Sequence, residues 1–268
     1  MEIIGYIASL LIGASLGLIG GGGSILTVPV LVYLFGVNPV LATAYSLFIV
    51  GATSLVGTFP KYKGGEINLK TALIFGIPSI AAVFATRAFI VPAIPKEIFS
   101  IGSLVVTKSL LMMVLFAILM VLASVSMIRK QKPEKTEMGE QKFNYPLILV
   151  EGAVVGVLTG LVGAGGGFLI IPALVLLSKL PMKQAVGTSL LIIAAKSLIG
   201  FTGDLGKQQM DWTLLLTVTG LAIVGIFIGN RLSRKVSSES LKKGFGWFVL
   251  VMGIYILIKE LLFPGGGH

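Results

Sequence analysis

The sequence predicts an all-α integral membrane protein with two inverted repeats, each made of a glycine-broken hairpin and three further membrane helices, about eight to ten membrane segments in all. The first observation is composition. The 268 residues are 55% hydrophobic and 12% charged, with a mean hydropathy of +1.00, whereas a soluble domain carries about 25% charged residues. The second is a run of four glycines, Gly20 to Gly23, which returns 143 residues later as a glycine-rich stretch ending at Gly167.

The duplication keeps one register across most of each half. At this offset the matches include Gly13 with Gly156, Gly17 with Gly160, Pro29 with Pro172, Ala42 with Ala185, Ser46 with Ser189, Ser54 with Ser197, Gly57 with Gly200 and Phe84 with Phe227, while Asn68 falls on Asp211. Soluble solenoids repeat every ~20–50 residues, so this period indicates the internal duplication of a secondary transporter. We expect repeats at 1–128 and 146–263, a polar linker at 129–145, and a remnant of an expression tag at 264–268.

The elements of the first repeat follow from the positions of charged and turn residues. No charged residue lies between Ile3 and Pro60, a stretch that as helix would measure about 87 Å, nearly three hydrocarbon cores of about 30 Å each. The expected segments are Ile3 to Ile19, Ile25 to Phe35 after the glycine break, Val40 to Phe59, Leu69 to Val91 and Ile98 to Ile128. The first segment lacks a basic region and a cleavage site, so we expect it to be retained.

The second repeat follows the same pattern. Its expected segments are Pro146 to Val162, Phe168 to Leu177, Gln184 to Phe201, Trp212 to Asn230 and Leu241 to Phe263. The pieces 25–35 and 168–177 are short for a full crossing, and the sequence leaves open whether they span the membrane or re-enter.

Lysine and arginine predict the sidedness. If each glycine break is a hairpin, most cations gather on one side of the membrane, whereas a kink would divide them almost evenly. The crowded side holds Lys61, Lys63, Lys70, Arg129, Lys130, Lys132, Lys135, Lys142, Lys179, Lys183, Arg231, Arg234, Lys235, Lys242 and Lys243, and the other holds Arg87, Lys96, Lys207 and Lys259. The positive-inside rule then places the linker in the cytoplasm and both termini outside. An odd number of membrane segments in each half also makes the two repeats inverted relative to each other. These scattered loop cations predict no nucleic-acid partner.

The consecutive glycines are candidates for a substrate site. They permit left-handed backbone and close approach of a ligand, and the helix that follows would point free N–H groups and the positive end of its dipole at an anion. The candidate residues are Gly21, Gly22, Gly23 and Ser24 in the first half and Gly165, Gly166 and Gly167 in the second. Close helix packing is the alternative, and we favour it for the spaced glycines Gly13, Gly17, Gly156 and Gly160.

Hydroxyl groups and one lysine follow each break. Tyr45 and Ser46 match Thr188 and Ser189, and each could contact substrate or bond to its own preceding helical turn. Lys196 lies two turns beyond Ser189 inside an apolar segment, where a cation costs at least about 2.5–3.5 kcal/mol unless it meets a partner or water. It is therefore a site candidate, with snorkelling to the interface as the alternative.

Other residues give weaker signals. Lys108 resembles Lys196 but could reach an edge of its segment, and Asn68 and Asp211 are typical helix N-caps. With no cysteine, histidine cluster, carboxylate pair or phosphate-binding loop, the sequence predicts neither an enzyme nor a metal or other cofactor.

Several motifs together resemble the TauE/SafE family, also called the sulfite exporter family. The similar residues are Gly20 to Gly23, Val28 to Leu31, Ala185 to Leu190 and Met210 to Trp212. The first half departs from the family pattern at Tyr45, where Thr is usual, and at Asn68-Leu69, in place of Asp-Trp. The resemblance covers nearly the whole chain.

The resemblance implies a plasma-membrane carrier for small sulfur-containing anions such as sulfite, sulfoacetate or other organosulfonates, often exported. An anion channel and a membrane scaffold without transport are the alternatives. The exact substrate, the direction, the coupling ion, for which a proton is one candidate, and the oligomeric state stay open at this point.

Overall fold

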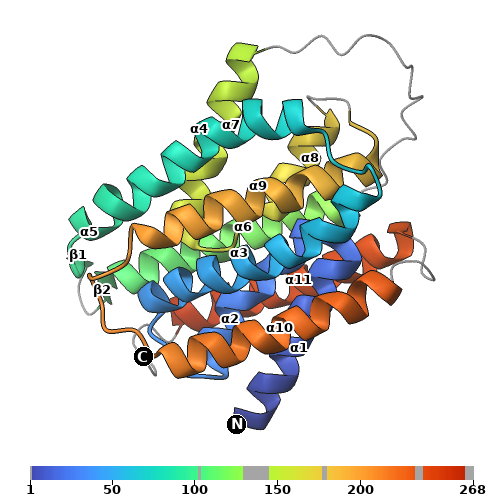
Figure 1. Cartoon of the computed structure of the whole chain (residues 1–268). Helices are drawn as coiled ribbons and strands as arrows, with labels where there is room; N and C mark the ends of the chain where they lie inside the picture. The colour runs from blue at the N-terminus through green and yellow to red at the C-terminus, as the bar shows by residue number, and fades with distance from the viewer. Residues whose placement is uncertain (1, 102–103, 129–144, 177–179, 233–237, 263–268) are drawn as a thin grey trace.

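The computed structural model describes residues 2–101, 104–128, 145–176, 180–232 and 238–262, and its architecture is almost entirely helical (Figure 1). The first half contains α1 Glu2–Ile19, the 3-10 helix η1 Gly20–Leu26, α2 Thr27–Tyr33, α3 Pro39–Lys63, α4 Leu69–Ala85, the π-helical turn η2 Thr86–Ile90, α5 Val91–Ala93, strands β1 Glu97–Ile101 and β2 Leu104–Thr107, and α6 Lys108–Ile128. The second half contains α7 Tyr145–Val162, α8 Gly167–Leu176, α9 Met182–Thr202, α10 Trp212–Leu232 and α11 Ser238–Leu262.

Within the described residues, five helices are long and apolar enough to cross a membrane. They are Pro39–Lys63, Leu69–Ala93, Lys108–Ile128, Met182–Thr202 and Trp212–Leu232, and shorter apolar helices accompany them. The prediction of an all-α membrane protein is confirmed. The predicted linker and the tail after Leu262 lie outside the described residues, apart from Tyr145, which begins α7.

The two halves pack against each other through reciprocal contacts. Helix α1 packs on α10, its counterpart α7 packs on α4, and the equivalent helices α3 and α9 pack together at the centre. Small residues allow the approach: a Cβ on Gly13 would lie 2.6 Å from the Ala222 carbonyl carbon, and one on Gly156 would lie 2.5 Å from Ser79 O. The packing interpretation of these spaced glycines is confirmed.

Two hydrogen bonds show how α3 and α9 run relative to each other. The Asp211 N–H, at the end of the loop that follows α9, donates to the Tyr45 hydroxyl near the start of α3. In the matching bond the Asn68 N–H, at the end of the loop that follows α3, donates to Thr188 Oγ1 near the start of α9, at 2.9 Å. Each helix therefore starts beside the loop that follows the other. Antiparallel equivalents are what inverted repeats require; the orientation of the repeats in a membrane stays a prediction.

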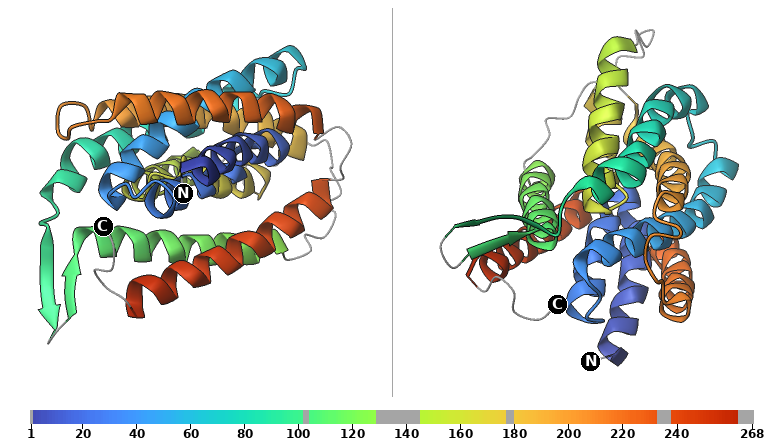
Figure 2. Two further views of the ribbon diagram at one scale, coloured as in Figure 1. Left: turned by 90° about the horizontal axis from the view of Figure 1, so that it is seen from below. Right: turned by 90° about the vertical axis from the view of Figure 1, so that its left-hand side faces the viewer.

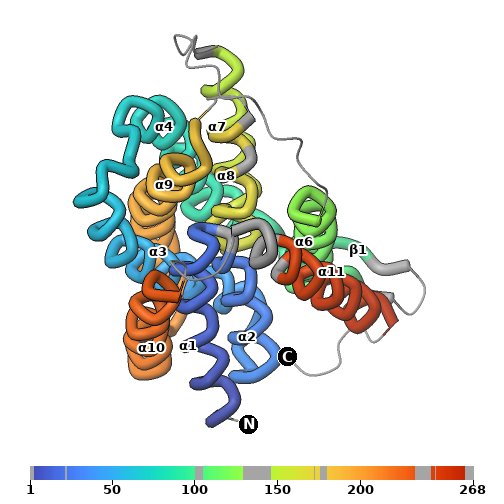
Figure 3. The backbone as a smooth tube through the Cα atoms, turned by 90° about the vertical axis from the view of Figure 1, so that its right-hand side faces the viewer, coloured from blue at the N-terminus to red at the C-terminus, as the bar shows by residue number. Residues whose placement is uncertain are grey.

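The last long helix of each half joins its counterpart at the edge of the molecule. Helices α6 and α11 lie side by side in Figures 2 and 3. Gly253 lets α11 approach α6, because a Cβ there would lie 3.1 Å from the Met120 Cβ.

The predicted membrane helix Ile98 to Ile128 is wrong in its first part, at residues 98–101 and 104–107. These residues belong to β1 and β2, an antiparallel pair in which Phe99 faces Val106, and the hairpin projects from the bundle (Figure 2). A run of β-branched residues, Val105 to Thr107, favours strand. The Thr107 hydroxyl then accepts a hydrogen bond from Leu110 N at 3.2 Å, so the helix begins only at Lys108.

The predicted helix starts at Asn68 and Asp211 are confirmed. Asn68 Oδ1 accepts from Thr71 N at 3.0 Å, and Asp211 Oδ1 accepts from Leu214 N at 3.0 Å. Both side chains satisfy amides that the first turn of a helix leaves free.

Candidate functional site

The two glycine breaks touch each other between the halves. A Cβ on Gly21 would lie 2.6 Å from the Gly167 Cα, so neither position has room for a side chain. Gly20 and its counterpart Gly163 both have left-handed backbone, with φ of 74° and 75°, which only glycine adopts readily. The consecutive glycines thus make a contact between backbones that larger residues would prevent.

The two breaks differ in conformation. In the first half the glycines and Ser24 lie in η1, and the Ser24 hydroxyl donates to Gly21 O at 2.8 Å. In the second half Gly165 and Gly166 take positive φ, and α8 starts directly at Gly167. Only the second break therefore leads straight into an α-helix. Gly22 lies in η1, but its surroundings are outside the described residues.

Lys196 points into the second break. Its side chain is 0% exposed, and Nζ donates to Thr159 Oγ1 at 2.9 Å. A Cβ on Gly166 would lie 2.6 Å from this Nζ, so the ammonium rests against glycine backbone. Lys196 therefore does not snorkel to an interface. Among the described residues Thr159 is its hydrogen-bond partner, and no described carboxylate pairs with it.

Thr159 was not among the residues predicted for the site. It lies on α7 and donates its own proton to Val155 O at 2.6 Å, which leaves its oxygen to accept from Lys196. The repeat comparison carried a usable signal, because Thr159 and Lys196 match Leu16 and Thr53 of the first half. Both positions gain polarity or charge in the second half alone, so the polar contact is asymmetric.

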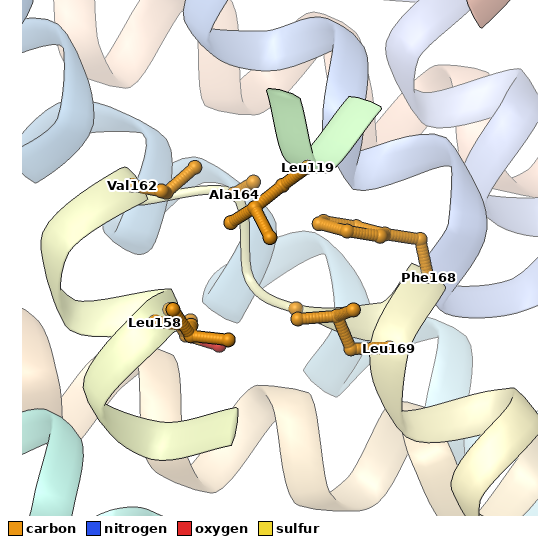
Figure 4. Close-up of a pocket in the computed structure, with 8 residues that line it drawn as sticks. Leu119, Leu158, Val162, Ala164, Phe168 and Leu169 are labelled. Atoms are coloured by element: carbon orange, nitrogen blue, oxygen red, sulfur yellow. The ribbon is translucent and has the colours of Figure 1, made fainter. Parts of the chain in front are cut away.

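A small pocket adjoins this turn. It is too narrow to admit a water-sized sphere and is lined by Leu119, Leu158, Thr159, Val162, Ala164, Gly166, Phe168 and Leu169. The side chains labelled in Figure 4 are all apolar and surround the space between α7 and α8. The Thr159 hydroxyl is the one side-chain polar group in this lining.

The four predicted hydroxyl residues have different surroundings. Tyr45 and Thr188 accept the bonds from Asp211 and Asn68 described above, and Ser189 donates to Val186 O in its own helix at 2.8 Å. Ser46 Oγ is buried without a partner among the described residues. In this structure Tyr45 and Thr188 connect the halves, and a contact of any of the four with substrate stays a prediction.

A second polar cluster lies at the end of α4. Arg87 is 0% exposed, its Nε lies 2.8 Å from Asp204 Oδ2, and its Nη1 donates to Thr43 Oγ1 at 3.0 Å. Arg87 was counted among the charges that report sidedness, and its side in a membrane stays a prediction, but the π-helical turn η2 carries the side chain into the protein and not into a loop. Burial raises the pKa of the Asp204 carboxyl above its ordinary range, and the guanidinium opposes this shift.

Two lysines complete this cluster by binding backbone carbonyls. Lys207 Nζ donates to Arg87 O at 3.1 Å and to Ala88 O at 2.8 Å, and Lys108 Nζ donates to Val91 O. Cations at the carbonyl end of a helix are favourable. Lys108 therefore lies at the edge of its helix, as its weaker sequence signal indicated.

Comparison with known proteins covers almost the whole chain. Residues 6–256 match the family model described as "Sulfite exporter TauE/SafE". A "Probable membrane transporter protein" of Xylella fastidiosa is 31% identical, covering 93% of this chain and 92% of its own. The "Probable membrane transporter protein YunE" of Bacillus subtilis is 28% identical over 98% of both chains. No solved structure gives a significant match.

Proposed function

We propose, from the premise that the chain belongs to the TauE/SafE sulfite exporter family of membrane transporters, that it is a secondary carrier which exports small sulfur-containing anions such as sulfite or organosulfonates. The observation that carries the proposal is the surroundings of Lys196. A buried ammonium whose described partner is a single neutral hydroxyl lacks a compensating charge, which is costly in a protein interior and more so in a membrane. An anion at the second break would supply that charge.

The groups around Lys196 suit a small oxyanion. The ammonium and the Thr159 hydroxyl offer donors, and the left-handed Gly166 keeps the backbone free of a side chain where the anion would lie. The side chains beside this polar contact are apolar but closely packed, so the carbon chain of an organosulfonate would fit there only if α7 and α8 moved apart. Sulfite has no carbon chain and would need only the donors of Lys196 and Thr159. Relative transport of the two therefore reports which part of the site selects the substrate.

The proposed topology has the linker 129–145 in the cytoplasm and both termini outside the plasma membrane. Antiparallel α3 and α9 support inverted repeats, and such repeats give many carriers two alternating faces.

The test is flux in proteoliposomes that contain the purified full-length protein. Sulfite, thiosulfate, sulfoacetate and taurine are compared as substrates, and counterflow is measured for each one that moves. Saturable counterflow of at least one sulfur anion is the expected result. Flux without counterflow would identify an anion channel, and no flux of any of the four would favour a scaffold.

A further inference from the structure

The guanidinium of Arg87 has a donor that the fold leaves unused. Its Nε pairs with Asp204 and its Nη1 with Thr43, but Nη2 is buried without a partner among the described residues. Buried donors are nearly always satisfied, and one left unpaired costs about 1–3 kcal/mol. An open donor on a buried guanidinium can bind an anion through a charge-assisted hydrogen bond.

The unused donor shares an edge of the guanidinium with Nε. This edge can hold two oxygens of one oxyanion through parallel hydrogen bonds, which is the strongest way in which arginine binds carboxylate or phosphate. Asp204 Oδ2 lies 2.8 Å from Nε as an ion pair, but neither Nε nor Nη2 makes a hydrogen bond to a described residue. The carboxylate therefore neutralises the guanidinium without using the two parallel hydrogen bonds that this edge offers.

Arg87 and Asp204 are carried by elements that differ in how easily they can move. Arg87 and Thr43 belong to membrane helices, whereas Asp204 lies in the loop 203–211 between α9 and α10. Leu205, Gly206 and Gln208 beside it are exposed. Loops open at lower cost than packed helices. A shift of this loop would separate the carboxylate from Arg87 and leave the Arg87–Thr43 hydrogen bond in place.

The cluster is also next to the second glycine break. A Cβ on Gly163 would lie 2.5 Å from the Thr43 Cα, and one on Gly160 would lie 2.6 Å from the Thr86 Cβ. Arg87 therefore lies near the Gly163 end of this break, whereas Lys196 contacts its Gly166 end. One short segment, 163–166, lies between two buried cations.

We propose that Arg87 is a second anion-binding residue on the transport path, and that Asp204 occupies its two-donor edge until a substrate oxyanion takes its place. The identity of that oxyanion rests on the proposed function; its chemical class, a small anion with at least two oxygens on one centre, follows from the edge itself. Withdrawal of Asp204 alone would leave a buried cation unpaired, which is strongly unfavourable. Opening of the loop is therefore coupled to arrival of the anion.

The test uses Asp204→Asn, which removes the competing carboxylate and keeps its shape. Thermal unfolding of the purified full-length protein is followed with increasing sulfite or sulfate, at constant ionic strength set with chloride. We expect Asp204→Asn to unfold at a lower temperature than the unmodified protein without oxyanion. Added oxyanion should restore the stability of this variant. Its apparent affinity should be at least about tenfold tighter than for the unmodified protein, because no carboxylate competes for Arg87 and the anion can place two oxygens on the guanidinium.

The matched control is Glu66→Gln, which removes the carboxylate of the part-exposed Lys61–Glu66 ion pair and should gain no affinity for oxyanion. Arg87→Gln added to Asp204→Asn should abolish the gain. If the gain survives in that double variant, or if Asp204→Asn loses stability and no oxyanion restores it, Arg87–Asp204 is a structural ion pair and the proposal is wrong.

Two further measurements separate binding at Arg87 from binding at Lys196 and from loss of folding. The gain should persist when Lys196→Met is added to Asp204→Asn, because the assay measures binding at Arg87 and not flux. A gain without any flux of sulfur anions would contradict the proposed function and leave this site standing. Arg87→Lys keeps the charge and loses the two-donor edge, so in folded protein it should weaken oxyanion binding about tenfold; unchanged affinity would overturn the proposal.

Discussion

Lys196 has the strongest single-residue signal in both sequence and structure. We expect Lys196→Met to weaken anion affinity roughly ten- to a hundredfold, because a desolvated charge-assisted contact contributes about 1.5–3 kcal/mol. Lys108→Met should cost much less, since Lys108, at the start of α6, donates to the Val91 carbonyl of α5. The measurement is the concentration dependence of uptake into proteoliposomes. Unchanged affinity in Lys196→Met would remove this residue from the site and leave the anion to backbone amides alone.

Tyr45 allows a second prediction at the residue scale. Tyr45→Phe removes the acceptor for the Asp211 N–H and with it one of two reciprocal bonds between the halves. We expect a loss of about 1 kcal/mol in stability, typical of one hydrogen bond, seen as a lower midpoint of thermal unfolding in detergent. Tyr255→Phe is the matched control, because Tyr255 is half-exposed and its ring contact with Tyr33 is kept. Equal midpoints for the two variants would show that the Tyr45 bond contributes nothing.

At the scale of elements, the glycine breaks carry the sharpest prediction. Gly166→Val and Gly22→Val should abolish transport while the protein still inserts. In Gly166→Val the new Cβ would displace the Lys196 Nζ, which lies 2.6 Å from it, and a β-branched residue is strained at φ of 67°. Gly220→Val is the control, since a Cβ on Gly220 meets nothing within 4 Å. Near-normal uptake by both break variants would give the glycines a packing role.

The sequence predicted most helices because apolar runs, caps and repeat register are local signals. The prediction failed where a local pattern fitted both helix and strand, or where a contact joined residues far apart in the sequence. The apolar run from Ile98 supported helix and strand alike, and its β-branched residues decided for strand. Arg87 looked like a loop charge because its partner Asp204 lies 117 positions away, 204 minus 87, and nothing nearby marks the pair. Thr159 was missed for the same reason.

The whole molecule combines a symmetric framework with asymmetric charges. The helix contacts and the two bonds between the halves occur in matched pairs. The buried cations do not, since Lys196 matches Thr53 and Arg87 matches Asn230. In the proposed carrier, matched surfaces would let the halves move against each other in two equivalent ways, and the charges at the second break would give an anion one preferred place. The symmetric framework would then serve alternating access, and the departures from symmetry would serve binding.

Inversion of the repeats predicts that matched loops face opposite sides of the membrane. The chain has no cysteine, so single cysteines report sidedness without background. We expect Lys63→Cys and Lys135→Cys to react with an impermeant maleimide only after the cells are permeabilised, because the positive-inside rule places their loops in the cytoplasm. Gln208→Cys, in the loop that matches the one after Lys63, should react from outside in intact cells. Lys63 and Gln208 are both exposed, so access to the reagent does not depend on burial. Labelling of Lys135→Cys from outside would overturn the sidedness, and labelling of Lys63→Cys and Gln208→Cys from the same side would overturn the inversion.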